Sequence, residues 1–380
     1  MTRALLLLTL ALLAPPALAT PCPPIERSAG PPVYVILYGY PYGSPYAPPP
    51  DQGGLPDLRM VDDDLIAMGR FFRALDPVQM HVHGEPTPAL IQAYSTFGVR
   101  APTWRDLLWS VGEVIDAIDR DTTSAEPAEV YIYFSGHGRR TGGQAGRGGG
   151  RLAIYGRAEG EAGVGNGMMH SALFADQILA PLAGRARVHL IVDTCESYAM
   201  LQTRRMRLIK RVVRAPPREM LAEQFVVAFP HVGALLATRG GTYENASRGG
   251  VFSHAVRSVA VGPADLDEDG IITYAEMADA LERTRSTSPW LNISTVVGPG
   301  DEADAPFIQW RKSPAARVCV PRRRSEASAL WDGQSRFAII EAGHEPLPLW
   351  LEAGHKFGMQ PAGRTIWWFV ALDGALHLGR

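Results

Sequence analysis

Apolar runs separated by polar or Gly/Pro-rich stretches predict a chain that alternates strands with helices. Continuous runs of β-branched and aromatic residues, typical of strands buried on both faces, occur at residues 33–38, 130–134, 188–192 and 233–238. Shorter runs predict two further strands, at residues 78–82 and 151–155. Apolar residues recur at helical spacing at residues 62–75, 103–118, 172–182 and 252–259. This alternation favours a mostly parallel, doubly wound α/β sheet flanked by helices.

The pattern changes beyond about residue 290. Short β-type runs with frequent turns replace the alternation, for example at residues 336–340 and 365–370. We therefore expect a large α/β domain at residues 32–289 and a small β-rich module at residues 290–380.

The first 19 residues have the pattern of a secretory signal peptide. Arg3 precedes an apolar run at residues 4–14, and the small-residue pattern Ala17-Leu18-Ala19 predicts cleavage after Ala19. The alternative is a membrane anchor, but the run is shorter than the roughly 20 residues that span a bilayer. No later segment is apolar enough to span, so we expect an exported protein, periplasmic or extracellular, with no membrane contact once the signal is removed.

Charge and cysteine content narrow the function classes. The chain has 37 basic and 39 acidic residues, which gives no global attraction to nucleic acid or to an anionic membrane. Its three cysteines are Cys22, Cys195 and Cys319. In an oxidising compartment we expect Cys22 to pair with Cys319, leaving Cys195 as the candidate reactive thiol. A thiol redox protein is disfavoured because the chain has no C-x-x-C pair.

Two chemically reactive side chains follow buried strands. His137 comes shortly after the run at 130–134, and Cys195 shortly after the run at 188–192. In parallel sheets, sites form beyond the carboxyl ends of the strands, so the two side chains are predicted to meet although 58 positions separate them. A thiolate next to an imidazole is a nucleophile with its proton carrier. Each residue alone has a simpler explanation, a small buried thiol or a hydrogen-bonded histidine; the combination favours catalysis.

The residues around this pair resemble a known family. The segments Tyr-Phe-Ser-Gly-His-Gly at 133–138 and Leu-Ile-Val-Asp-Thr-Cys-Glu-Ser at 190–197 are similar to the two signatures of caspase-like cysteine peptidases. The likeness is strongest to the bacterial metacaspase-like branch of the caspase and legumain clan, and it covers roughly residues 32–285. It implies a caspase-like sheet and a thiol protease in which Cys195 is the nucleophile and His137 transfers protons.

The resemblance also implies roles for three backbone or pocket positions. The N–H groups of Gly138 and Cys195 are expected to hold the oxyanion. Asp193 corresponds to the family position that lines the primary specificity pocket, where a carboxylate favours Arg or Lys before the scissile bond. The alternative is that Asp193 caps the following turn. Two positions depart from the family pattern, because Tyr198 stands where Gly often follows the Ser and Glu196 places a negative charge beside the thiol.

A twelve-residue loop at 265–276 fits the EF-hand ligand pattern. Its predicted Ca²⁺ ligands are Asp265, Asp267, Asp269, the Ile271 carbonyl, Thr273 and Glu276, with Gly270 at the sharp turn. The alternative is an acidic turn that caps a helix beginning near Tyr274. We expect no organic cofactor.

The basic segment 204–218 follows the predicted nucleophile. It fits a solvated amphipathic helix. In caspase-like proteins, however, this is the region where self-cleavage often splits the chain. Self-cleavage would show as smaller fragments in the intact mass of the wild-type protein but not of Cys195→Ala; identical intact chains in both would exclude it.

These features give two competing hypotheses. The first is a cysteine endopeptidase (a hydrolase) that acts on peptide or protein substrates and cleaves after Arg or Lys. The second is a catalytically weak, calcium-binding caspase-like scaffold that presents its C-terminal module to a partner. Tyr198, Glu196 and the aromatic run Trp367-Trp368-Phe369 keep the second hypothesis open, although the aromatic run fits a core better than a binding face.

Overall fold

The computed structural model of the chain describes most of its length. The described residues are 25–42, 57–58, 60–121, 124–141, 151–157, 167–195, 197–201, 218–237, 244–245, 249–287, 291, 295–320, 322, 325–333, 335–343, 345–362, 364–372 and 375–379. The predicted signal peptide at 1–19, Cys22, Glu196 and residues 204–217 of the basic segment lie outside them, as does the side chain of Tyr198. Among the described residues, no helix has both the length and the hydropathy required to cross a bilayer.

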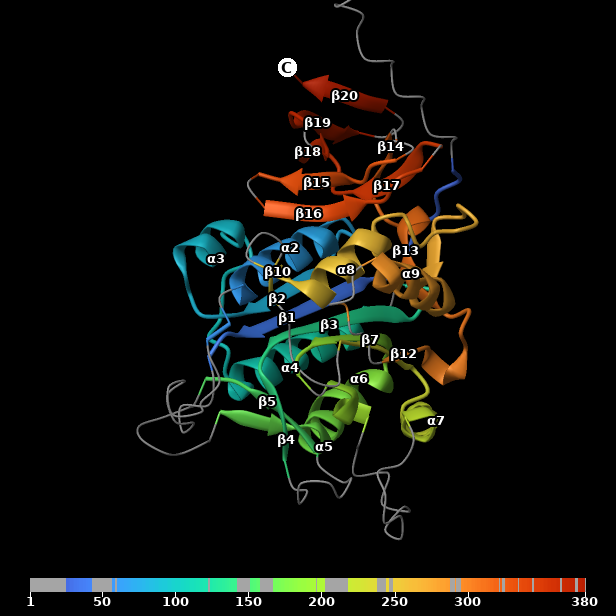
Figure 1. Cartoon of the computed structure of the whole chain (residues 1–380). Helices are drawn as coiled ribbons and strands as arrows, with labels where there is room; N and C mark the ends of the chain where they lie inside the picture. The colour runs from blue at the N-terminus through green and yellow to red at the C-terminus, as the bar shows by residue number, and fades with distance from the viewer. Residues whose placement is uncertain are drawn as a thin grey trace, which may run out of the picture.

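A six-stranded central sheet organises the larger part of the molecule (Figure 1). Its order is β12-β8-β7-β3-β1-β2, and all neighbours are parallel except the edge strand β12. The strands are β1 (Val33–Tyr40), β2 (Gln79–His83), β3 (Ala128–Gly136), β7 (Ala186–Asp193), β8 (Val232–Leu236) and β12 (Thr295–Val297). The predicted mostly parallel α/β sheet is confirmed.

Helices cover both faces of this sheet because alternate residues of each strand point to opposite sides. On one face Leu37, Tyr133 and Ile191 pack under α2 (Val61–Arg73), α8 (Val251–Ala260) and α9 (Tyr274–Thr287). On the other face Ile132 and Leu190 pack against α4 (Trp104–Arg120), α7 (Arg218–Ala228) and the segment that runs from α5 (Ser171–Phe174) to α6 (Ala180–Ala183). Thr103 caps α4, since its side chain accepts a hydrogen bond from the Asp106 amide. The short helix α3 (Pro88–Ala93) follows β2.

The helix predicted at 172–182 is interrupted. Between α5 and α6, residues Ala175–Leu179 form a π-helical segment. Pro181 is the second residue of α6 and has no N–H to donate. The missing donor is consistent with a local change from α-helical to π-helical hydrogen bonds. The spacing of apolar residues alone does not reveal such a change.

Antiparallel sheets form the C-terminal part of the chain. One pairs β14 (Ala316–Val320) with β17 (Leu347–Leu351). The other has the order β16-β15-β18-β19-β20, formed by β15 (Ser328–Asp332), β16 (Ser335–Ile340), β18 (Lys356–Pro361), β19 (Trp367–Leu372) and β20 (Ala375–Gly379). Phe369 lies in their core, whereas Trp367 and Trp368 are half-buried. We call residues 316–379 the C-terminal module.

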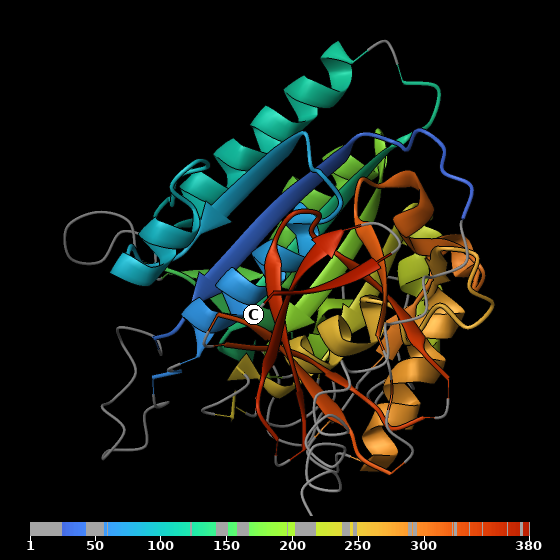
Figure 2. The same cartoon turned by 90° about the horizontal axis from the view of Figure 1, so that it is seen from above.

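The module sits on the face of the central sheet that α2 and α8 cover, as the view from above also shows (Figure 2). Its apolar core is continuous with the core under α2 and α8. Residues between the predicted boundary at 290 and the module belong to the larger domain: β12 extends the central sheet, and β13 (Pro306–Gln309) pairs with β11 (Ile271–Thr273). The separate antiparallel sheets therefore begin at Ala316, later than the expected boundary.

Short strands and single helical turns complete the fold. A three-stranded sheet joins β4 (Gly138–Thr141), β5 (Arg151–Tyr155) and β6 (Met168–His170). A second small pair is formed by β9 (Glu244–Asn245) and β10 (Gly249–Gly250). The single helical turns are η4 (Ser197–Leu201), η6 (Pro299–Asp301) and η7 (Trp310–Lys312).

A buried polar network ties the amino-terminal halves of β3 and β7 to later elements. Glu129 accepts hydrogen bonds from Arg187 at 2.9 Å and from Gln309 at 2.7 Å, and its other oxygen lies 3.4 Å from His189. His189 reaches the hydroxyl of Tyr274 through Nδ1 at 2.8 Å. Burial alone would raise the pKa of Glu129, but its bond to His189 and the nearby positive charges hold that pKa below the ordinary value.

Replacing Glu129 with Ala is expected to lower the free energy of unfolding at pH 7 by about 3–5 kcal/mol, because it leaves buried donors without their acceptor. A carboxyl whose folded-state pKa is depressed stabilises the fold above its unfolded value of about 4.5, so the difference from wild type should shrink as the pH falls through that range. Urea unfolding at pH 7 and pH 4 measures both effects. Glu126→Ala is the matched control, since Glu126 is half exposed and pairs with Lys312, and it should cost less than about 1 kcal/mol. Equal losses of unfolding free energy in the two variants would contradict the assignment of Glu129 to a buried polar network.

Candidate active site and metal-binding loop

Strand register brings His137 and Cys195 to the same edge of the sheet. β3 and β7 are parallel neighbours, and their last paired residues are Ser135 and Asp193. His137 and Cys195 each lie two residues beyond this pair. Because parallel neighbours are about 4.8 Å apart, the backbones that carry the predicted imidazole and thiol leave the sheet side by side.

The backbones after these strands are in close contact at Gly138. A Cβ added to Gly138 would lie 2.5 Å from the carbonyl oxygen of Cys195 and 2.8 Å from Oγ1 of Thr194. Only glycine therefore permits this approach. The two residues expected to provide the oxyanion N–H groups, Gly138 and Cys195, are thus adjacent in space.

Contacts on both sides of His137 hold its backbone in place. Gly136 has a φ of 151°, and a Cβ there would meet the carbonyl oxygen of Tyr40 at 2.6 Å. Tyr155 on β5 donates its amide N–H to the carbonyl of His137 at 3.3 Å, and its ring stands perpendicular to the imidazole at 6.5 Å. The His137 side chain is 4 % exposed. These contacts fix the turn that carries the imidazole.

The predicted nucleophile, Cys195, follows β7. It is half-buried and is not part of a disulfide. Cys319 is disulfide-bonded, and Cys22, the partner that we predict for it, lies outside the described residues. A cysteine and a histidine at neighbouring strand ends are compatible with the pairing on which nucleophilic catalysis by cysteine depends.

Two buried carboxylates lie beneath this edge of the sheet. Asp193 accepts hydrogen bonds from the amide of Ser253 at 3.1 Å and from its hydroxyl at 2.6 Å. Asp64 on α2 accepts from the Gly250 amide at 2.8 Å and from the Ser135 hydroxyl at 3.2 Å. A Cβ on Gly250 would lie 2.6 Å from Asp193 and 2.7 Å from Asp64, so the two side chains adjoin there. We call Asp64 and Asp193 the acidic pair.

Burial favours the protonated form of Asp64. Both side chains of the acidic pair are only 2 % exposed. Burial raises the pKa of Asp64 to about 8, and the neighbouring charge of Asp193 adds to this effect, while Arg257 and the bonds from Gly250 and Ser135 oppose it. Two neighbouring carboxyls in a water-poor site are stabilised by an added cation.

Asp64 is a site residue that the sequence reasoning missed. Three consecutive aspartates, Asp62 to Asp64, are typical of the acidic first turn of a helix, and this explanation hides a separate role for Asp64. Helical spacing nevertheless places Asp64 among the buried residues Val61, Leu65 and Met68, at positions i, i+3, i+4 and i+7. A carboxylate on the apolar stripe of a helix was the available signal. For Asp193, the bonds from Ser253 show that the carboxylate reaches the first turn of α8.

The predicted metal loop brings three of its six ligands together. Asp265, Asp267 and Asp269 each offer an oxygen within 4.8 Å of the others. Gly270 has a φ of 77° and donates its amide N–H to Asp265. Burial raises the pKa of Asp265 to about 6, with bonds from Gly270 and Trp350 acting in the opposite direction. A cluster of hard carboxylate oxygens suits Ca²⁺.

The other predicted ligands make different contacts. Glu276 accepts hydrogen bonds from the amides of Leu266 at 3.1 Å and Thr273 at 2.8 Å, and from the Thr273 hydroxyl at 2.9 Å. The Glu276 amide donates back to Thr273 Oγ1, which completes a capping box at the start of α9. Ile271 lies in β11, paired with Gln309. The helix expected to begin near Tyr274 does begin there, so the loop is both an acidic cluster and a helix cap.

Comparisons with known proteins do not add to this picture. No family model matches the chain, and no curated protein matches it either. The site is therefore defined by its own geometry: a histidine and a cysteine at neighbouring strand ends, a buried acidic pair below them and a carboxylate loop about the start of α9.

Proposed function

We propose that the chain is a caspase-like cysteine endopeptidase that cleaves after Arg or Lys, with Cys195 as nucleophile and His137 as the proton-transfer residue. The observation that carries the proposal is the register of β3 and β7, which puts both residues two positions past the Ser135–Asp193 pair. The two signature segments, at 133–138 and 190–197, support the caspase-like assignment.

The proposed reaction has two stages, formation of a thioester on the cysteine and its hydrolysis by water. The Cys195 thiolate attacks the carbonyl carbon of the scissile bond, and negative charge develops on the carbonyl oxygen. The adjacent N–H groups of Gly138 and Cys195 are suited to stabilise that charge. His137 then gives a proton to the leaving amine, which departs as the thioester forms. Water, deprotonated by the same imidazole, hydrolyses the thioester and restores the thiol.

The acidic pair supports the preference for basic residues. Asp193 lies two residues before the nucleophile, and Asp64 is bonded to Ser135, two residues before His137. A substrate guanidinium that reaches these oxygens would gain charge-assisted hydrogen bonds in a low-dielectric environment. An Asp or Glu side chain at the same place would be repelled by the pair.

A panel of fluorogenic peptides tests the function. The peptides differ only in having Arg, Lys, Met or Asp before the scissile bond, and each is assayed with wild type and Cys195→Ala, with and without Ca²⁺. We expect Cys195-dependent turnover of the Arg and Lys peptides. Absence of turnover on every peptide would favour the scaffold hypothesis instead.

Export of the enzyme is part of the proposal. The leader pattern at residues 1–19 supports it. The disulfide at Cys319 supports it independently, because structural disulfides persist in oxidising compartments.

We also propose that the loop at 265–276 binds Ca²⁺. Asp265, Asp267 and Asp269 would hold the ion, and the Ile271 carbonyl, Thr273 and Glu276 would complete the ligand set. The ion would be structural. Asp265 also accepts a hydrogen bond from Trp350 of the C-terminal module at 3.5 Å, so the loop lies at the contact between domain and module.

Ca²⁺ is expected to raise the melting temperature of the purified protein. At a concentration about 100-fold above Kd, binding adds about 2.7 kcal/mol to the free energy of unfolding, which corresponds to a shift of several degrees. The shift should weaken below about pH 6, where protons compete for Asp265. Differential scanning fluorimetry with Ca²⁺ and with Mg²⁺ measures it.

Two variants make this measurement specific. Asp267→Ala should abolish the Ca²⁺-dependent shift, whereas Asp304→Ala, which removes an exposed carboxylate outside the loop, should leave it unchanged. A melting temperature that does not respond to Ca²⁺ in the wild-type protein would exclude the site.

A further inference from the structure

The acidic pair and the α4 helix lie on opposite faces of the central sheet (Figure 1). Asp64 belongs to α2, and Asp193 bonds to Ser253 of α8, so both carboxylates are on the face that these two helices cover. In the proposed function they bind the side chain before the scissile bond. Successive side chains of an extended peptide point in opposite directions. The side chain after the scissile bond should therefore point toward the α4 face.

The position of His137 sets the direction in which the rest of the substrate continues. In the proposed reaction the imidazole gives its proton to the leaving amine, so that amine lies on the His137 side of Cys195. The strand that leads to His137 is β3, and its next neighbours in the sheet are β1 and then β2. We call the peptide beyond the scissile bond the leaving half. Its direction is across the carboxyl ends of β1 and β2.

Residues 155–157 follow the same direction. The first donates its amide N–H to the carbonyl of His137, just after β3. A Cβ on the second, Gly156, would collide with the hydroxyl of Tyr38 on β1. The guanidinium of the third pairs at 3.6 Å with Glu85, two residues beyond β2. This stretch therefore lies along the path expected for the leaving half.

An exposed aromatic side chain lies on this path. Tyr42 follows β1 by two residues and is 44 % exposed. Its ring stands edge-on to that of Tyr40, with centroids 5.6 Å apart. Tyr40 is buried in the core on the α4 face, and it is paired in register with Gly136, the residue before His137. The Tyr42 ring is thus supported by the core on the face that the side chain after the scissile bond should reach.

We propose, resting on the proposed function, that the leaving half binds across the carboxyl ends of β1 and β2, and that Tyr42 selects an aromatic or large apolar residue directly after the scissile bond. An exposed ring offers apolar area to such a side chain, and a pair of aromatic rings adds a further attraction. Tyr42 is then a specificity-determining residue on the other side of the scissile bond from Asp193.

The spacing of the strands sets the length of this site. From β3 to β2 are two strand spacings, about 9.6 Å, which an extended peptide covers in about three residues. The first residue of the leaving half would lie beside Tyr42, and the third beside the ion pair of Glu85 and Arg157. Substrates that continue for three residues after the scissile bond should therefore fill the site.

The first experiment compares quenched fluorescent peptides that differ only in having Phe, Leu, Gly or Asp after Arg. In wild type, kcat/KM for the Phe peptide should exceed that for the Gly peptide by about tenfold. Tyr42→Ala should reduce this ratio to about twofold or less. Tyr42→Phe should keep the wild-type ratio, because the ring rather than the hydroxyl makes the contact.

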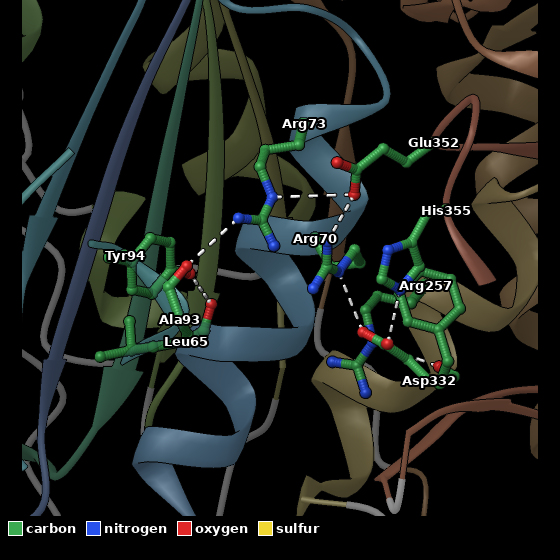
Figure 3. Close-up of polar contacts among 10 residues, drawn as sticks. Leu65, Arg70, Arg73, Ala93, Tyr94, Arg257, Asp332, Glu352 and His355 are labelled. Carbon is green, nitrogen blue, oxygen red and sulfur yellow. Dashed lines mark hydrogen bonds and ion pairs between the residues drawn. The ribbon is translucent and has the colours of Figure 1, made fainter. Parts of the chain in front are cut away.

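Phe97→Ala is the matched control. Phe97 is 41 % exposed, close to the value for Tyr42, but it follows α3. Three residues earlier, the Tyr94 hydroxyl bonds to the Leu65 carbonyl on α2, which places this segment on the face of the acidic pair (Figure 3). The control should keep the wild-type ratio of Phe to Gly turnover. A ratio that falls equally in both alanine variants overturns the inference.

The second experiment does not depend on turnover. A peptide amide with p-benzoylphenylalanine directly after Arg, followed by two more residues, is irradiated with Cys195→Ala protein. The adducts are then mapped by mass spectrometry of the digested protein. They are expected in segments 40–42 and 155–157, and an excess of the unlabelled Phe peptide should abolish them. With the probe two residues before Arg, labelling should move to other segments.

The outcomes separate the inference from the proposed function. No hydrolysis of any peptide overturns the proposed function, while the photolabelling still decides where the leaving half binds. Adducts that map to the C-terminal module or to β8 overturn the inference, as does the absence of any adduct that the unlabelled peptide displaces. The same ratio of Phe to Gly turnover in wild type and Tyr42→Ala also overturns it. If Tyr42→Ala does not fold, the photolabelling alone decides.

Discussion

Replacing Cys195 with Ala is expected to reduce kcat/KM for Arg peptides by about 10⁴-fold or more, because the chain then lacks its nucleophile and the remaining groups do not act independently. Stability should change little, since the side chain is half-buried and is not in a disulfide. His137→Asn should cause a loss of similar order. Initial rates together with circular dichroism and melting temperature measure both effects.

The control for the histidine is His231→Asn. His231 is exposed at the amino-terminal end of β8, away from the carboxyl ends of the strands, and its replacement should leave the rate unchanged. Cys195→Ser provides a second comparison, because a hydroxyl of nearly the same size is a much weaker nucleophile without strong activation. Wild-type rates in Cys195→Ala would contradict the assignment of the nucleophile and exclude a Cys–His mechanism.

Replacing Asp193 with Asn is expected to lower kcat/KM for Arg peptides by about 10²–10³-fold, while turnover of a Met peptide changes far less. Asn retains an oxygen that accepts from Ser253 but carries no charge, so the α8 contact survives and the charge-assisted contact with the substrate is lost. A cost of about 3–4 kcal/mol, at the lower end of that for losing one member of a buried charge pair, corresponds to that range of rates.

Asp62→Asn is the matched control for this variant. Asp62 lies on the same turn of α2 as Asp64, but it accepts a hydrogen bond from Thr87 at 2.8 Å instead of facing the acidic pair. It should keep the wild-type preference for Arg over Met. An equal loss on Arg and Met peptides in Asp193→Asn would mean that Asp193 maintains the fold rather than the specificity.

The central strands and the positions of the histidine and the cysteine at their ends could be predicted from the sequence. Buried parallel strands appear in the sequence as apolar runs. The runs in β3 and β7 end where polar residues begin, at Ser135 and Asp193. Once two runs are parallel neighbours, the positions just beyond them converge. His137 and Cys195 follow from this rule without knowledge of the loops.

The acidic pair could not be predicted in this way. Asp64 and Asp193 come from α2 and β7, and only tertiary packing brings them together at Gly250. The loop at 265–276 shows that one pattern can serve two structures. Its spacing fits six Ca²⁺ ligands, and the same residue types also let Glu276 and Thr273 form a capping box.

α2 connects two surfaces that look unrelated along the chain. Asp64 belongs to the acidic pair, while Arg70, six residues later and about 9 Å along the axis, grips Asp332 and Glu352 of the module (Figure 3). The acidic pair and the module are therefore joined through a single helix of 13 residues. A chimera that exchanges the C-terminal strands for those of another protein should therefore transplant this helix with them as one unit.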